Sequence, residues 1–400
     1  MKQNLLLILL FTLFSALSAK ESADPLRKKA LAGDLNAMVT LGDEFFRGVN
    51  RPVNRSLGAF WYRKAAVGGN APGKYRYGVC LEFGWGTKKS PRLAFEEYKG
   101  ASTLPAARLR VAEMLLKGVP AGNDLAEIIP DREKAVGIME ALCKENFYPA
   151  LEKLAKTLYE FPKTRKSRAK EIYELVLKST NVEKPAPRLL TFQAKLLQEG
   201  VGVKQDFFFA RALLEIAARK NDAEAQYLFA SALESGRGCA VDEKKAFDYC
   251  ALSAKSAFPA AMVRMGDYHL EGKFLPHDPA EAFKLYQKAA DKQYPPALYK
   301  LGWCSENGIG TEKNLQRAFN FYERSASLGD ARGNYHAGRC FRDGIGVAAD
   351  PAGAFFFFRR SAALGSKEGM LALAECYRTG RGCSPDETLS SSLREEAAKL

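Results

Sequence analysis

Residues 297–308 have the sequence ALYKLGWCSENG, and close variants of this stretch recur along the chain. Its last residue belongs to a series of glycines spaced 36 residues apart: Gly200, Gly236, Gly272, Gly308, Gly344 and Gly380. Gly48 and Gly84 keep the same spacing, and Gly118 follows after 34 residues. A fixed period of this size is typical of a solenoid in which each repeat is a pair of helices.

The residue pattern of each repeat predicts two helices joined by a glycine loop. The residue six positions before the loop glycine is always small: Gly42, Gly78, Ala112, Ala155, Ala194, Ala230, Gly266, Gly302, Gly338 and Ala374. Glycine costs a helix interior about 1 kcal/mol relative to alanine, so its recurrence predicts that two helices approach closely there. Six residues after the glycine stands a helix-capping residue type: Asn54, Ser90, Asp206, Asp242, Asp278, Asn314, Asp350 and Asp386. An aromatic residue follows in the second helix at Tyr98, Tyr286, Tyr322 and Phe358. We therefore expect an all-α superhelix of about ten helix-pair repeats.

One repeat shows a family resemblance especially well. The residues Ala37, Leu41, Gly42, Gly48, Trp61, Tyr62, Ala65, Ala66 and Gly69 together resemble the Sel-one-like repeat (SLR) family, relatives of the tetratricopeptide repeat (TPR). The resemblance covers residues 37–400 and weakens around 150–185, where Phe161 stands in place of the loop glycine. It implies a TPR-like alpha-alpha superhelix that serves as an adaptor for other proteins.

The first 19 residues predict a secretory signal peptide. Lys2 precedes an apolar run from Leu5 to Phe14, and the run is followed by Ser15, Ala16, Leu17, Ser18 and Ala19, which are small apart from Leu17. The run is shorter than the roughly 20 residues that span a bilayer. We expect a periplasmic or secreted protein without a membrane anchor after cleavage. Residues 20–36 are expected to form an N-terminal capping helix, and residues 37–400 one continuous solenoid.

The chain has eight cysteines, and export would permit disulfides. Equivalent positions in neighbouring repeats lie about 8–10 Å apart, beyond the roughly 7 Å that a disulfide can span. This spacing argues against a ladder through the cysteines that precede successive loop glycines. Pairs within one repeat, Cys239 with Cys250 and Cys376 with Cys383, are the predicted candidates. The alternative is that most cysteines are small buried apolar residues.

The sequence offers no convincing catalytic or metal-binding constellation. The recurring Gly-x-Gly follows a helix in every repeat, whereas a phosphate-binding loop follows a strand once, so we interpret it as a turn. His269, His277 and His336 lie in different repeats without metal-ligand spacing. Some secreted relatives are proposed to act on beta-lactams, and Ser167 with Lys170 matches Ser-x-x-Lys, but the companion motifs do not occur. We predict no enzymatic activity, no metal and no cofactor; a beta-lactam hydrolase is a remote alternative.

Charge suggests a binding surface. The formal net charge is +14, and the position eight before the loop glycine is rich in basic residues. With Lys156 three positions further on, these residues form the basic row: Arg76, Arg110, Lys153, Lys156, Arg264, Lys300 and His336. In related solenoids this helix face lines the concave groove. We expect a protein or peptide partner that carries acidic side chains or a C-terminal carboxylate and docks along Arg76, Arg110 and Lys153.

Other interpretations of the same residues stay open. The basic row could be an ordinary solvated helix face. The chain could instead bind an anionic envelope polymer, such as peptidoglycan or another glycan, with help from Tyr75, Tyr227, Tyr299 and Tyr335, although these tyrosines occupy a predicted core position. Nucleic acid is not an expected partner of an exported protein. The sequence leaves the oligomeric state, the identity of the partner and the role of the irregular repeat undecided.

Overall fold

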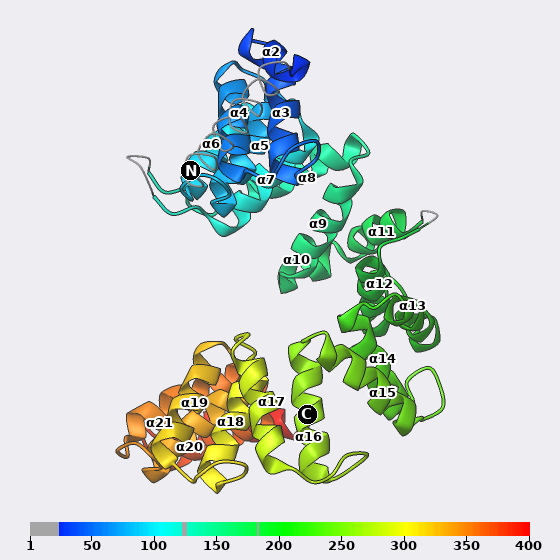
Figure 1. Cartoon of the computed structure of the whole chain (residues 1–400). Helices are drawn as coiled ribbons and strands as arrows, with labels where there is room; N and C mark the ends of the chain where they lie inside the picture. The colour runs from blue at the N-terminus through cyan, green and yellow to red at the C-terminus, as the bar shows by residue number, and fades with distance from the viewer. Residues whose placement is uncertain (1–23, 122–125, 182–183) are drawn as a thin grey trace, which may run out of the picture. The chain divides into compact units, whose positions relative to one another are not determined.

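The computed structural model describes residues 24–121, 126–181 and 184–400 (Figure 1). The predicted signal peptide, residues 1–19, therefore lies outside the described residues. Within the described residues the chain forms helices throughout, and the sole β-type pairing is one isolated bridge between Val119 and Ile128. None of the described helices is both long and apolar enough to span a bilayer.

The chain divides into two compact units, Met1–Ser179 and Thr180–Leu400, and the division falls inside the irregular region around 150–185. The helices of the first unit are α2 (Pro25–Leu31), α3 (Leu35–Arg47), α4 (Arg55–Val67), α5 (Ala71–Phe83), α6 (Pro91–Gly100), α7 (Pro105–Lys117), α8 (Arg132–Lys144), α9 (Tyr148–Tyr159), α10 (Pro162–Ser167) and α11 (Ala169–Thr180), whose last residue crosses the boundary. The helices of the second unit are α12 (Pro187–Glu199), α13 (Phe207–Arg219), α14 (Ala223–Ser235), α15 (Glu243–Lys255), α16 (Pro259–Glu271), α17 (Pro279–Ala290), α18 (Pro295–Asn307), α19 (Leu315–Ser327), α20 (Ala331–Asp343), α21 (Pro351–Ala363), α22 (Lys367–Thr379) and α23 (Glu387–Ala398).

These helices form the predicted pairs, and the all-α repeat fold is confirmed. We call the first helix of each pair the A helix (α3, α5, α7, α9, α12, α14, α16, α18, α20, α22) and its partner the B helix. The pair that begins with α9 is irregular, because α10 and α11 together occupy the place of one B helix. At the N-terminal end α2 covers α3, and Ala30 is buried in one cluster with Leu41 and Trp61. Helix α2 ends at Leu31 and Asp34 caps α3, so residues 35 and 36 of the predicted capping segment belong to α3.

The predicted caps begin the B helices. The side chains of Asn54, Asp206, Asp242, Asp278, Asn314, Asp350 and Asp386 accept hydrogen bonds of 2.8–3.0 Å from backbone N–H groups two or three residues on. Asp131 does the same for α8 after the insertion in the third repeat. These bonds satisfy N–H groups that a helix start otherwise leaves without an intrahelical partner.

The Gly-x-Gly motif is a turn with a packing role. The first glycine, such as Gly308 with φ of 71°, ends the A helix in the left-handed conformation that glycine adopts without strain. The second glycine, such as Gly310, presses against the start of the preceding B helix. A Cβ atom on Gly310 would lie 1.9 Å from the carbonyl oxygen of Pro279. No side chain fits there, so the motif is explained without a phosphate ligand.

The small residue in each A helix makes room for the large residue of the B helix. A Cβ atom at Gly42, Gly78, Gly266, Gly302 or Gly338 would lie 2.5–2.7 Å from the ring of Tyr62, Tyr98, Tyr286, Tyr322 or Phe358. In three repeats in which alanine replaces the glycine, the equivalent B-helix residue is smaller than tyrosine: Met139 with Ala112, Leu214 with Ala194, and Cys250 with Ala230. All six of these residues are buried. The close approach is confirmed, and the volume of each pair is shared between its two helices.

Candidate protein-binding surface

The basic row lies on the A helices, and its cations are held by carboxylates of the scaffold. In the first unit, Nε of Arg76 lies 3.4 Å from Asp43, Arg110 contacts both Glu82 and Glu113, and Nζ of Lys153 lies 2.8 Å from Glu113. Lys156 pairs with Glu152 at 3.1 Å. Most of these bonds join one repeat to the next.

The same arrangement continues in the second unit. Arg264 contacts Glu234 at 3.0 Å and Glu271 at 2.9 Å, and Nζ of Lys300 lies 2.8 Å from Asp267. These two basic side chains are 29 % and 26 % exposed, against 40 % for Arg76 and 42 % for Lys153. The more accessible part of the basic row is therefore in the first unit.

A tyrosine of the B helix orients each of several carboxylates. Oη of Tyr98 donates to Glu82 at 2.7 Å, and the same carboxylate accepts from Arg110. Tyr62 with Asp43, Tyr286 with Asp267, and Tyr322 with Glu306 repeat this bond at 2.6–2.8 Å. Burial and the bond to Glu82 raise the pKa of Tyr98, so it stays a donor. We call this tyrosine, carboxylate and basic residue the triad; it shows that the basic row is not a bare positive stripe.

His336 does not add a charge to the basic row. Its ring stacks on Tyr322 with centroids 4.9 Å apart, and Tyr299 and Tyr335 also pack against it. Burial, and then the positive charge of Arg339, lower the pKa of His336 to about 4. The imidazole is thus neutral at physiological pH.

A cavity in the first unit brings Arg110 together with residues that the sequence did not single out. The cavity has a volume of about 440 Å³ and lies at the ends of α5 and α7, where Phe83, Lys89 and Lys117 join Arg110 in its lining. Neither Lys89 nor Lys117 forms an ion pair with any described residue. Against Glu82 and Glu113 in the same lining, the three basic residues leave one excess positive charge.

Exposed aromatic rings stand beside this cavity. Phe83 is 49 % exposed and Trp85 is 41 % exposed, although both are large apolar side chains. The two rings stack with centroids 4.9 Å apart, and the guanidinium of Arg110 lies 5.8 Å from the ring of Phe83. We call Phe83, Trp85, Lys89, Arg110 and Lys117 the Phe83 surface. The sequence did carry a signal, because Phe83 is the one aromatic residue at a position that is polar or charged in the other glycine-loop repeats.

The tyrosines of the polymer alternative do not form an open platform. Tyr75, Tyr227, Tyr299 and Tyr335 are half-buried, less than the core position we expected. Each packs against another aromatic ring, as Tyr75 does against Tyr98 and Tyr227 against Phe258. Their faces are therefore partly occupied by the scaffold itself.

The predicted disulfides are not formed, and all eight cysteines are free. Cys239 and Cys250 are not bonded in the structure, where the two thiols face different partners: Sγ of Cys239 lies 3.7 Å from the carbonyl oxygen of Ala232, and Sγ of Cys250 lies 3.7 Å from that of Ala261. Cys376 and Cys383 lie in one apolar cluster but remain thiols. Burial raises the pKa of Cys80, Cys250, Cys304 and Cys340 to about 12, which suits the alternative of inert core residues.

The described residues contain no group of three or more His, Cys, Asp or Glu side chains placed to hold a metal ion. Ser167, the candidate of the Ser-x-x-Lys match, ends the short helix α10 and donates to the carbonyl oxygen of Thr164 at 3.3 Å. That bond is local and backbone-directed, so the geometry around Ser167 does not indicate an activated nucleophile.

Comparisons with known proteins agree with this architecture. The family model of the Sel1 repeat matches residues 35–70, 71–96, 194–222, 223–257, 259–294, 295–330, 331–366 and 367–393, and it leaves the irregular region unmatched. The crystal structure of a Sel1 repeat protein from Oxalobacter formigenes is 23 % identical, with 61 % of this chain and 96 % of that chain covered at a TM-score of 0.50. The antigen c5321 of uropathogenic Escherichia coli, which displays an SLR fold, is 19 % identical, with 94 % and 90 % covered at a TM-score of 0.48.

At 23 % identity the Oxalobacter formigenes structure speaks for the fold alone. No match to this sequence was found among curated proteins. The repeat matches cover more than half of the chain, and they coincide with the helix pairs, the capped B helices and the glycine loops. The chain therefore belongs to the Sel1 repeat family and is a TPR-like scaffold of a class that generally binds other proteins.

Proposed function

We propose that this Sel1-repeat protein is an exported scaffold that binds an acidic segment of a partner protein at the Phe83 surface. The observation that carries the proposal is the exposed Phe83–Trp85 stack beside a cavity whose two lysines form no ion pair with any described residue. Aromatic residues and arginine dominate the binding energy of many protein interfaces, so this combination favours a docking site. The partner segment would place an apolar side chain against the two rings and carboxylates beside Lys89 and Lys117.

The basic row extends this site along the first unit. Arg76, Lys153 and Lys156 keep side-chain exposures of 38–42 % although each pairs with a carboxylate. Exposed ion pairs of this kind contribute about 0–1 kcal/mol each, so carboxylates of a partner could replace the internal ones at little cost. Arg264 and Lys300 are less exposed than Arg76, Lys153 and Lys156 and lie in the other unit from the Phe83 surface, and His336 is neutral.

Export is part of the proposal and rests on residues 1–19, with their basic start, apolar run and small residues at the end. The mass of the protein purified from the envelope fraction of producing cells tests it. We expect a chain that begins after Ser18 or Ala19. A full-length chain confined to the cytoplasm would contradict export but leave the binding site untouched.

Peptide selection on the purified full chain tests the binding site. Random peptides displayed on phage are selected on the wild type and, in parallel, on the double variant Lys89→Glu, Lys117→Glu. We expect binders rich in Asp or Glu next to an aromatic or aliphatic residue, and we expect the double variant to lose them. Lys244→Glu, Lys284→Glu is the matched control, because both lysines are exposed and lie in the second unit. Selected peptides that bind the double variant as well as the wild type would refute the Phe83 surface as the site.

A further inference from the structure

The repeat of α20 and α21 contains none of the three residues of a triad of its own. The carboxylate of a triad comes either from five positions before the loop glycine, as at Asp43 and Asp267, or from two positions before it, as at Glu82 and Glu306. Before Gly344 these two positions hold Arg339 and Arg342. The position that holds a basic residue in the next A helix is Ala372, and the tyrosine of the B helix is Phe358. The repeat thus loses the tyrosine hydroxyl, the carboxylate and the basic partner together.

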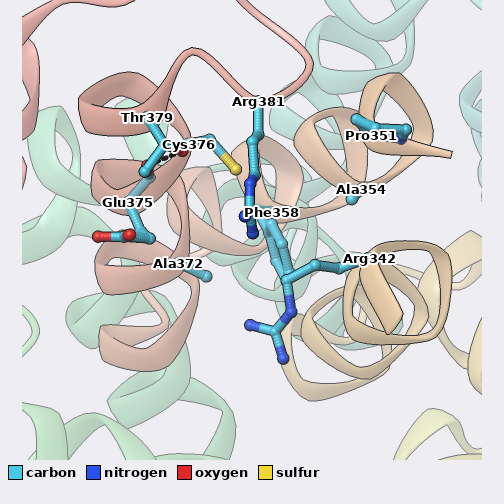
Figure 2. Close-up of a pocket in the computed structure, with 9 residues that line it drawn as sticks. All are labelled: Arg342, Pro351, Ala354, Phe358, Ala372, Glu375, Cys376, Thr379 and Arg381. Atoms are coloured by element: carbon cyan, nitrogen blue, oxygen red, sulfur yellow. Dashed lines mark hydrogen bonds between the residues drawn. The ribbon is translucent and has the colours of Figure 1, made fainter. Parts of the chain in front are cut away.

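The change leaves a cavity between α20, α21 and α22. Its volume is about 260 Å³, and Ala372 lines it where longer basic side chains stand in other repeats. Figure 2 shows the ring of Phe358 and the sulfur of Cys376 directed into this space. At about 30 Å³ for each water molecule, the volume equals that of eight or nine waters and admits one side chain with a small polar group.

Two arginines line the cavity without a carboxylate that faces them from inside. Arg342 pairs with its neighbour Asp343 at 2.7 Å, and its guanidinium lies 5.9 Å from the ring centroid of Phe358. Arg381, from the loop after α22, forms no ion pair with any described residue. Its side chain lines the same cavity as Phe358.

The acidic residue in the lining forms its ion pairs with arginines outside the cavity, and the hydrogen bond with Arg378, followed by the charges of Arg378, Arg394 and Arg381, lowers the pKa of Glu375. Glu375 pairs with Arg378 at 2.6 Å and with Arg394 at 3.6 Å. Figure 2 shows its carboxylate turned away from Arg342 and Arg381. The cavity therefore combines apolar walls with two guanidinium groups at its edge.

We propose that this cavity binds a carboxylate attached to an apolar group. In the triads a guanidinium or ammonium of one repeat meets a carboxylate of another. Here the ligand's carboxylate would meet Arg381, which forms no ion pair with a described residue, and would share Arg342 with Asp343, whose two carboxylate oxygens accept from it at 2.7 Å. Arginine binds carboxylates in a forked, charge-assisted arrangement, and the apolar group would fill the space beside Phe358, Ala372 and Cys376. The C-terminal residue of a partner protein and a small organic acid share this chemistry. The site is separate from the Phe83 surface and does not depend on the function proposed for it.

Ligand-observed NMR titration of the full chain tests the proposal with N-acetylphenylalanine and its amide. The free acid should saturate the protein, and the amide should not. Arg381→Ala and Arg342→Ala should each weaken binding of the acid by at least about tenfold, or 1.4 kcal/mol. Ala372→Leu, which fills the cavity without a change in charge, should abolish it. Lys313→Ala removes an exposed charge elsewhere in the second unit and should leave the titration unchanged.

A peptide that ends in phenylalanine distinguishes the two sources. Tighter binding of the peptide than of N-acetylphenylalanine points to a protein C-terminus, and equal binding points to a small organic acid. Equal binding of acid and amide, no saturation by either, or an undiminished affinity in Arg381→Ala would overturn the proposal. Lys89→Glu, Lys117→Glu serves as a second control, because it disables the Phe83 surface and should not alter this titration.

Discussion

Several single residues in this protein have two structural roles at once. A tyrosine such as Tyr322 packs on a glycine of the A helix and at the same time donates to the carboxylate of Glu306, which holds Arg339 of the next repeat. One ring therefore sets both the distance between two helices and the bond between two repeats. This double role suggests where a small substitution has a large effect.

The volume shared by Gly302 and Tyr322 leads to a double-mutant prediction. Gly302→Ala places a Cβ atom 2.6 Å from the ring and should destabilise the protein by about 1–3 kcal/mol, as overpacking does. In the background of Tyr322→Leu the same substitution should cost much less, because the pair then matches Ala194 and Leu214 elsewhere in the chain. Urea unfolding of the four proteins measures the coupling, and additive effects would show that the two positions do not share one volume.

His336 leads to a prediction on pH. Its ordinary pKa is 6.5, and burial in the folded state lowers it to about 4. As the pH falls from about 6.5 to 4, the unfolded chain takes up a proton that the folded chain refuses, so stability is lost in this window and unaffected above it. His336→Phe removes that proton uptake and should shrink the loss of stability between about pH 7.5 and pH 5. The variant keeps the charged groups that face the ring, which are Arg332, Arg339, Glu306 and Glu368. An unchanged pH dependence of stability in His336→Phe would contradict the assignment of this loss to His336.

The loops are the elements in which sequence and structure agree most closely. Position within the repeat identified the left-handed glycine, the cap and the short turn between them. The structure adds the reason for the second glycine: the backbone at the start of the preceding B helix lies so close that it leaves no room for a side chain. That reason was hidden in the sequence, because the contact joins a loop to the helix start of the preceding pair.

Gly310 and Gly329 make a matched pair for a loop prediction. Both have positive φ, of 66° and 85°, but a Cβ on Gly310 would strike the carbonyl oxygen of Pro279 and a Cβ on Gly329 would meet open space. Gly329→Ala should cost about 1–2 kcal/mol from the left-handed backbone alone. Gly310→Ala should cost at least about 1 kcal/mol more, because the loop must move away from α17. Equal unfolding free energies for the two variants would show that the contact is unimportant.

The candidate sites were harder to predict than the elements. The position of the basic row was evident from the repeat, but the carboxylates that hold it come from neighbouring helices and were not assigned as its partners. The cavity beside Phe358 depends on the absence of side chains at Ala372 and on the reversal of charge at Arg342. Such a site can be recognised from the sequence only when three positions on different helices are compared with their equivalents in other repeats. A motif search along the chain does not make that comparison.

At the scale of the whole molecule, the chain is two compact units of one repeat family, Met1–Ser179 and Thr180–Leu400. The Phe83 surface belongs to the first and the cavity beside Phe358 to the second. The irregular region that separates the repeat matches was visible from Phe161 and from the missing cap. Two distinct binding chemistries on one chain suit a scaffold that contacts more than one molecule.

The cysteines provide a test that covers the whole chain. Alkylation of the denatured, unreduced protein followed by mass spectrometry should label all eight thiols. In the native protein the buried thiols, whose pKa burial raises to about 12 at Cys80 and Cys304, should react far more slowly than Cys239. A mass lower by two labels in the denatured, unreduced sample would reveal a disulfide and contradict the free-thiol structure.

The central claim is that a partner protein docks at the Phe83 surface, and photo-crosslinking in cells tests it most directly. A photoreactive phenylalanine analogue replaces Trp85, and a second chain carries it at Arg219, which is 70 % exposed and lies in the other unit. We predict a discrete protein adduct at Trp85 that disappears when Lys89→Glu and Lys117→Glu are added, and no such adduct at Arg219. An adduct at Trp85 that survives both charge reversals, or one that forms equally at Arg219, would contradict the claim.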